Sequence, residues 1–81
     1  MPTGPSSERV IKALVKEGFA MSTGTGRSGS HRTYYRRRSA QLSQKVTVVL
    51  GERETPRGTM RSYANQLGIS LRELDAWVSR V

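Results

Sequence analysis

The chain has 81 residues and no cysteine, with fourteen lysines and arginines against six aspartates and glutamates, for a formal net charge of +8. This length predicts one domain at residues 7–81 behind a short flexible leader at residues 1–6, and it excludes a complete two-half dinucleotide-binding fold. With no cysteine and a single histidine, the composition excludes disulfides and a zinc site. We therefore expect no resident metal or cofactor.

The positive charge is concentrated in the middle of the chain. Residues 27–61 contain nine lysines and arginines and only two glutamates. A basic region confined to one part of a small domain is typical of nucleic-acid binding. The plainer alternative is a solvated basic face that only increases solubility. The sequence has no signal-peptide pattern and no apolar run of membrane-spanning length, so we expect a cytoplasmic protein.

The first predicted element is a helix at about residues 7–17. Ser6 or Ser7 can cap its N-terminus, and Gly18 follows its last turn at the position that glycine favours. Four apolar residues recur at helical spacing and form one apolar stripe, namely Val10, Ile11, Leu14 and Val15.

Three strands are expected next, at residues 19–21, 30–37 and 45–50, paired as an antiparallel meander. Alternate residues of a strand face opposite sides. The strand at 30–37 therefore presents His31, Thr33, Tyr35 and Arg37 on one face, and Ser30, Arg32, Tyr34 and Arg36 on the other. One of the two adjacent tyrosines is expected in the core, while the other is available to stack on an unpaired base.

Two helices are expected in the last third of the chain. Thr55 is the predicted N-cap of the first, with Pro56 in its first turn and Gly68 at its end. Ser70 and Glu73 have the spacing of a capping box and open the last helix. The order α-β-β-β-α-α predicts an α+β domain with a three-stranded antiparallel sheet and the helices packed on one face.

The glycines at 24, 26 and 29 have the G-x-G-x-x-G spacing of a dinucleotide-binding loop. That motif needs a helix N-terminus directly behind it, whereas a strand pattern follows here. We interpret the glycines as a hairpin loop rather than as a cofactor site.

Residues 59–79 have the pattern of a helix-turn-helix, which makes a DNA-binding regulator one alternative. The helix that would read the major groove contains Glu73 and Asp75 and little positive charge beyond Arg72, which argues against this alternative.

His31 is the candidate catalytic residue, although a lone histidine is more often only a surface or core residue. Its ordinary pKa of about 6.5 permits proton transfer near neutrality. An imidazole that takes the proton of an RNA 2′-hydroxyl, beside arginines that stabilise the developing phosphate charge, would cleave RNA without a metal. A non-catalytic RNA-binding module using the same basic face is the runner-up interpretation.

The residues at 29–34, Gly-Ser-His-Arg-Thr-Tyr, resemble the G-S-H-x-x-[Y/F] signature of HicA-type mRNA interferase toxins. Residues 56–62, PRGTMRS, followed by 66–70, QLGIS, resemble the second signature of that family. Residues 10–14 together with Gly18 and Phe19 also fit the family pattern, and the likeness extends over about residues 7–78.

This resemblance implies a double-stranded-RNA-binding-like fold, an endoribonuclease acting on mRNA, and a HicB-type antitoxin that covers the active site. The sequence does not give the oligomeric state of the free toxin, which we expect to be a monomer. It implies His31 as the catalytic histidine. We expect an acidic antitoxin surface opposite the basic chain. The RNA-binding residues expected beside His31 are Gly29, Ser30, Arg27, Arg32, Arg36, Arg37, Lys45 and Arg61.

The chain departs from the family pattern in three places. The loop at 22–28 and the hairpin at 37–44 are longer, and the stretch after the third strand, residues 49–53, lacks a second histidine. The general acid for the leaving 5′-oxygen is therefore not identified, and solvent, a water polarised by an arginine or the reprotonated His31 are the alternatives.

Overall fold

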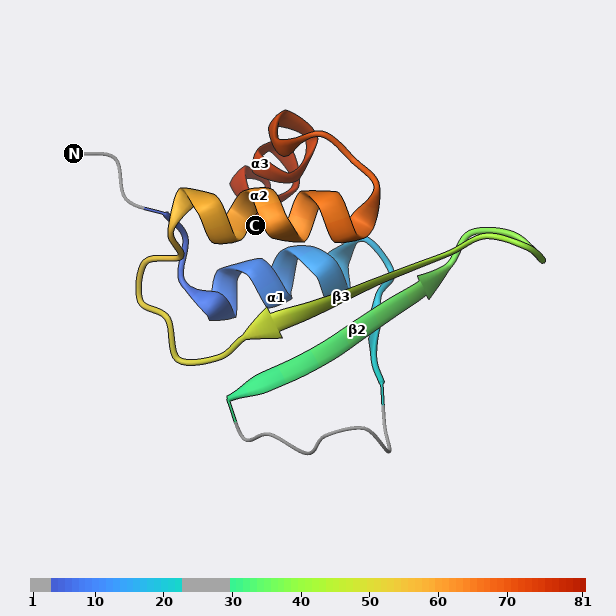
Figure 1. Ribbon diagram of the computed structural model, residues 1–81, viewed down its shortest axis with the longest axis horizontal. Helices are drawn as coiled ribbons and strands as arrows, with labels where there is room; N and C mark the ends of the chain where they lie inside the picture. The colour runs from blue at the N-terminus through green and yellow to red at the C-terminus, as the bar shows by residue number, and fades with distance from the viewer. Residues whose placement is uncertain (1–3, 23–29) are drawn as a thin grey trace.

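The computed structural model describes residues 4–22 and 30–81, and these form an α+β fold in the predicted order. Helix α1 covers Ser7–Lys16, and strands β1, β2 and β3 cover Ala20–Met21, His31–Arg37 and Ser43–Val49. Helices α2, at Arg57–Leu67, and α3, at Leu71–Ser79, complete the domain (Figure 1). The prediction of three helices and a three-stranded antiparallel sheet is confirmed.

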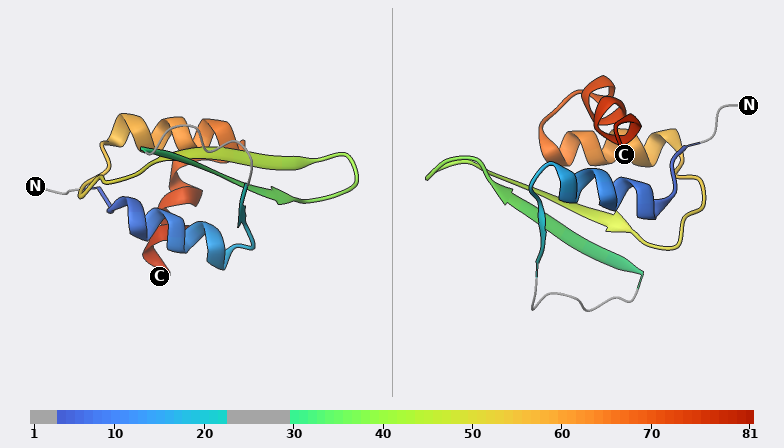
Figure 2. Two further views of the ribbon diagram at one scale, coloured as in Figure 1. Left: turned by 90° about the horizontal axis from the view of Figure 1, so that it is seen from below. Right: turned by 180° about the vertical axis from the view of Figure 1, so that it is seen from behind.

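The sheet has the order β1-β2-β3, with both neighbouring pairs antiparallel. Tyr34 lies opposite Val46, and this register places the buried residues of both strands on the same face. All three helices lie on that side of the sheet, where α1 and α2 pack against β3 and α3 packs against α1 and α2, so the other face of the sheet is left uncovered (Figure 2). The hairpin between β2 and β3 extends past the helices (Figure 1).

Local signals set most of the helix ends. Ser6 caps α1 by accepting a hydrogen bond from the amide of Arg9, and Ser70 caps α3 in the same way from Glu73. Gly68 ends α2 in the left-handed conformation, with φ of 74°, which a side chain would disfavour.

The prediction that Thr55 caps α2 is wrong, because the N-cap residue is Pro56 and no side chain caps this helix. The side chain of Thr55 is instead buried, and the described residues offer its hydroxyl no hydrogen-bond partner. Its backbone amide donates to the carbonyl of Pro5 at 2.8 Å. A side chain at Gly4 would overlap the carbonyl oxygen of Thr55, so part of the predicted leader packs closely against the domain.

The hydrophobic core lies between the sheet and the helices. Its largest fully buried aliphatic side chains are Leu14 of α1, Met60 of α2 and Leu74 of α3, which pack with Val46 and Val48 of β3. Burying one such side chain contributes about 1.5–3 kcal/mol. The core therefore fixes which face of β2 and β3 points toward the helices.

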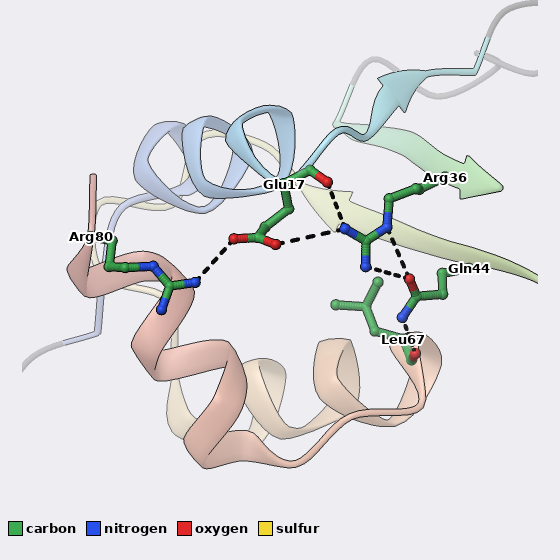
Figure 3. A network of polar contacts seen from close by, with 5 residues as sticks. All are labelled: Glu17, Arg36, Gln44, Leu67 and Arg80. Carbon is green, nitrogen blue, oxygen red and sulfur yellow. Dashed lines mark hydrogen bonds and ion pairs between the residues drawn. The ribbon is translucent and has the colours of Figure 1, made fainter. Parts of the chain in front are cut away.

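A polar network closes one end of this core (Figure 3). The guanidinium of Arg36 donates to the carbonyl of Glu17 and, at 3.1 and 2.7 Å, to the side-chain oxygen of Gln44. Gln44 in turn donates to the carbonyl of Leu67 at 2.9 Å. The carboxylate of Glu17 lies 3.6 Å from Arg36 and 3.0 Å from Arg80. The network thus joins the end of α1, both long strands, α2 and the end of α3.

Candidate active site and nucleic-acid interface

His31 is the first residue of β2 and is exposed on the uncovered face of the sheet. The side-chain oxygen of Ser30 lies 3.1 Å from Nδ1 of the imidazole. When Nδ1 carries the hydrogen and donates it to Ser30, Nε2 is the unprotonated nitrogen that can accept a proton from a substrate. A hydroxyl beside the ring can therefore select the tautomer that a general base needs.

Two helices hold the strand residue that lies opposite His31. That residue is Val49, whose amide donates to the hydroxyl of Tyr63 at 2.8 Å and whose carbonyl accepts from the hydroxyl of Ser7 at 2.6 Å. Ser7 also accepts a hydrogen bond from the amide of Glu52 at 3.0 Å. Side chains of α1 and α2 thus position the end of β3 that pairs with His31.

Tyr63 is buried beneath this strand. Burial raises the pKa of its hydroxyl above the ordinary value of 10.0, and the negative charge of Glu52 acts in the same direction, while the hydrogen bond from the Val49 amide opposes them. Tyr63 therefore stays neutral at physiological pH and serves as the acceptor for Val49.

The uncovered face forms a short series of cross-strand pairs beyond His31. Thr33 and Thr47 come next, with their hydroxyl oxygens 3.0 Å apart, and Tyr35 lies opposite Lys45. Arg37 and Ser43 form the last pair. All six acidic residues of the chain lie outside the three strands. The uncovered face is therefore positively charged and carries no carboxylate of its own.

Tyr34 and Tyr35 have different environments. Tyr34 is in the core with 4% of its surface exposed, whereas Tyr35 is 47% exposed on the uncovered face. The prediction that one of the two tyrosines packs in the core is confirmed, and Tyr35 is the one that a ligand can reach.

The predicted site residues do not all gather on this face. His31, Arg37 and Lys45 share it, while Arg32 is exposed but alternates to the other side of β2. Arg61 is exposed on α2, in the helical layer. Gly29 and Arg27, like the other glycines of the G-x-G-x-x-G spacing, lie outside the described residues.

Arg36 differs most from its predicted surroundings. Its side chain is 15% exposed, and its guanidinium lies over the rings of Phe19 and Trp77, at 4.7 and 5.5 Å from their centroids. These contacts and the network of Figure 3 direct it toward the core side of the sheet. We therefore leave Arg36 out of the RNA-binding surface proposed below.

Ser7 and Tyr63 are the residues of this site that the sequence did not reveal. Ser7 was predicted only as a possible helix cap, and Tyr63 lies within the helix predicted between Pro56 and Gly68. Their bonds to Val49 join residues 42 and 14 positions apart, and no local pattern indicates such a pairing.

Within residues 4–22 and 30–81, no three histidine, cysteine or acidic side chains are grouped so that they could bind a metal ion. In the same residues, none of the helices has the length and apolar character needed to span a membrane.

The fold and the exposed histidine on a basic sheet face define a small α+β protein suited to a nucleic-acid substrate. Residues 7–69 match the family model described as HicA toxin of bacterial toxin-antitoxin. Because the match covers most of the chain, the protein belongs to the HicA toxin family, whose members are toxin-antitoxin components that act on RNA and generally cleave mRNA. The resemblance noted in the sequence is thereby confirmed. No curated protein and no solved structure matches the chain.

Proposed function

We propose that this chain is the endoribonuclease of a toxin-antitoxin pair and that His31 is its general base. Family membership supports the substrate class. The observation that carries the residue assignment is the position of His31, exposed at one end of a sheet face that has cationic residues and no carboxylate. Arg37 and Lys45 on that face would bind the phosphate backbone.

In the proposed reaction Nε2 of His31 removes the proton of a 2′-hydroxyl as that oxygen attacks the adjacent phosphorus. The new bond joins the 2′-oxygen to phosphorus, and the bond between phosphorus and the 5′-oxygen breaks. The products are a 2′,3′-cyclic phosphate and a 5′-hydroxyl, whose proton comes from the imidazolium or from water. No metal ion is needed, because the substrate supplies the nucleophile and the imidazole transfers the proton.

Ser30 has a supporting role in this proposal. Its hydroxyl, 3.1 Å from Nδ1, would accept the hydrogen of that nitrogen, so that Nε2 is the nitrogen that carries no hydrogen, as a base requires. The contact would also restrict rotation of the ring at the exposed end of the strand.

A HicB-type antitoxin is the proposed partner, by membership of the family. With a formal charge of +8 on the toxin, an acidic antitoxin surface would associate rapidly, at a rate that falls with ionic strength. Covering His31 and the uncovered sheet face would block access of RNA.

The test is cleavage of an unstructured RNA in excess EDTA by the wild-type chain and by His31→Ala, with RNA binding measured in parallel. We expect the variant to bind RNA but to cleave at least about 100-fold more slowly, since a positioned general base contributes about 10²–10⁴-fold. Arg72→Ala, which changes an exposed arginine of α3, is the matched control and should cleave like the wild type.

Equal cleavage by His31→Ala and the wild type would contradict the assignment of the base. Binding without cleavage by both proteins would instead favour the non-catalytic RNA-binding module.

A further inference from the structure

Tyr35 presents an aromatic ring in the middle of a polar surface. Its partner on β1 is Ala20, whose methyl group is too small to cover the ring, and its partner on β3 is Lys45. The ring is consequently about half exposed although it lies on the central strand of the sheet. An exposed aromatic ring at the centre of a sheet face is the arrangement by which several RNA-binding domains stack bases.

A cavity of about 370 Å³ lies beside this ring, lined by Ser22, Tyr35, Ser43, Gln44 and Lys45. The side chain of Gln44 is hydrogen-bonded to Arg36 and to the carbonyl of Leu67, which lie on the helix side of the sheet. The side chains left to contact a ligand are therefore two serine hydroxyls, the ammonium of Lys45 and the phenol of Tyr35. These groups suit hydrogen bonds to the edge of a base and an ion pair with its phosphate.

The cavity is separated from His31 along the same face of β2. Tyr35 follows His31 by four residues, which corresponds to about 13 Å along a strand. Thr33 and Thr47 lie between them and are hydrogen-bonded to each other. This part of the face therefore has only small, uncharged side chains. An RNA strand with its scissile phosphate at His31 can therefore cross the threonine pair and reach Tyr35.

We infer that Tyr35, with Ser22, Ser43 and Lys45, forms a subsite for one unpaired nucleobase of the RNA substrate, a short distance along the strand from the phosphate that is cut. This inference rests on the proposed ribonuclease function. The base stacks on Tyr35, and Lys45 contacts the adjoining phosphate. The cationic residues of the uncovered face suit the anionic backbone of RNA, and the exposed ring of Tyr35 beside them suits a nucleobase, which favours RNA over an apolar protein segment as the occupant.

Stacking on Tyr35 requires the face of the base to be free, and in a duplex both faces of each base are already stacked. The subsite therefore makes the substrate single-stranded in at least this stretch. The subsite thus selects unpaired mRNA segments, although the family resemblance of the sequence implies a fold like that of double-stranded-RNA-binding domains.

The experiment measures binding of a 2′-O-methyl RNA, which lacks the attacking hydroxyl, so that affinity is read without cleavage. Tyr35→Ala, Tyr35→Phe and the wild-type chain are compared on the single strand and on its duplex. We expect the wild type to prefer the single strand, Tyr35→Ala to bind it roughly 5- to 100-fold more weakly, and Tyr35→Phe to stay close to the wild type, because the phenyl ring still stacks.

Met21→Ala is the matched control. Met21 is 50% exposed and pairs with Tyr34, so its side chain lies on the other face of the sheet beside the subsite strand. Its removal should leave RNA affinity unchanged. A circular-dichroism spectrum and an unfolding curve for each variant separate loss of the ring from loss of the fold.

Equal affinity of Tyr35→Ala and the wild type would overturn the subsite, and so would a preference for duplex RNA. If Tyr35→Ala binds the antitoxin more weakly than the wild type does but binds RNA equally well, the subsite is also overturned. The ring of Tyr35 then belongs to the interface with the antitoxin. If the ring-dependent binding is found but His31→Ala cleaves like the wild type, the subsite stands and only the proposed role of His31 fails.

Discussion

The backbone of Val49 illustrates how single residues support the candidate site. Tyr63 and Ser7 bind its amide and carbonyl, so the strand residue opposite His31 is connected to two helices. An unsatisfied buried polar group costs about 1–3 kcal/mol. Loss of either side chain is therefore expected to destabilise the fold and to loosen the support of His31.

Tyr63→Phe tests this connection and its pH dependence. The variant removes the acceptor of the Val49 amide and should lower the free energy of unfolding by about 1–2 kcal/mol at neutral pH. Because burial raises the folded-state pKa of Tyr63, the unfolded chain loses this proton first as the pH rises. The stability difference between wild type and variant should thus be complete below pH about 10 and shrink above it.

Urea unfolding of both proteins across this pH range measures the difference. A difference that stays constant through the alkaline range would show that Tyr63 ionises equally in the folded and unfolded chains, contrary to the account.

Predictions at the scale of residues succeeded where the information was local. Strand alternation separated Tyr34 from Tyr35 and placed His31 with Arg37. The same reasoning could not find the bond of Ser7 to Val49, because it depends on how α1 packs against the end of the sheet. Arg36 was expected to bind RNA because of the concentrated positive charge, although strand alternation places it on the face opposite His31, and the sequence does not reveal its contacts with the rings of Phe19 and Trp77.

At the scale of elements, Arg36 is the connection between the sheet and the helices. Its planar guanidinium contacts Gln44 through two nitrogens, donates to Glu17 and stacks over two aromatic rings. Lysine keeps the charge but lacks the fork of donors and the flat surface.

Arg36→Lys should therefore lower the free energy of unfolding by about 1–3 kcal/mol. Arg38→Lys, at an exposed position in the hairpin that follows β2, should change it by no more than about 0.5 kcal/mol. Urea unfolding of the two variants measures both changes, and losses of equal size would show that the network of Figure 3 contributes nothing specific.

Element boundaries were predictable where one residue type determines the backbone. Gly18 and Gly68 follow their helices with positive φ, and Ser70 caps the last one. The start of β3 was predicted at residue 45 but lies at Ser43, because the antiparallel pairing with Arg36 and Arg37 extends the strand. Pairing of this kind depends on the hairpin and not on the propensity of the segment itself.

At the scale of the whole molecule, the charges are distributed between two layers. The carboxylates of Glu17 and Asp75 form ion pairs with Arg36, Arg57 and Arg80 on the helical side. The cations of the uncovered sheet face lie apart from these carboxylates. The basic region could be located from the sequence. Which of its residues join the network of Figure 3 and which lie on the uncovered face depends on how the helices pack against the sheet.

The central claim is that His31 activates a 2′-hydroxyl of an unpaired RNA. Its most direct test is identification of the end groups that the wild-type chain produces from a single-stranded RNA in excess EDTA. The account predicts a 2′,3′-cyclic phosphate and a 5′-hydroxyl, with no cleavage where the sugar before the scissile phosphate is 2′-deoxy. Products with a 3′-hydroxyl and a 5′-phosphate, or cleavage beside the 2′-deoxy sugar, would contradict it, since water and not the RNA would then be the nucleophile.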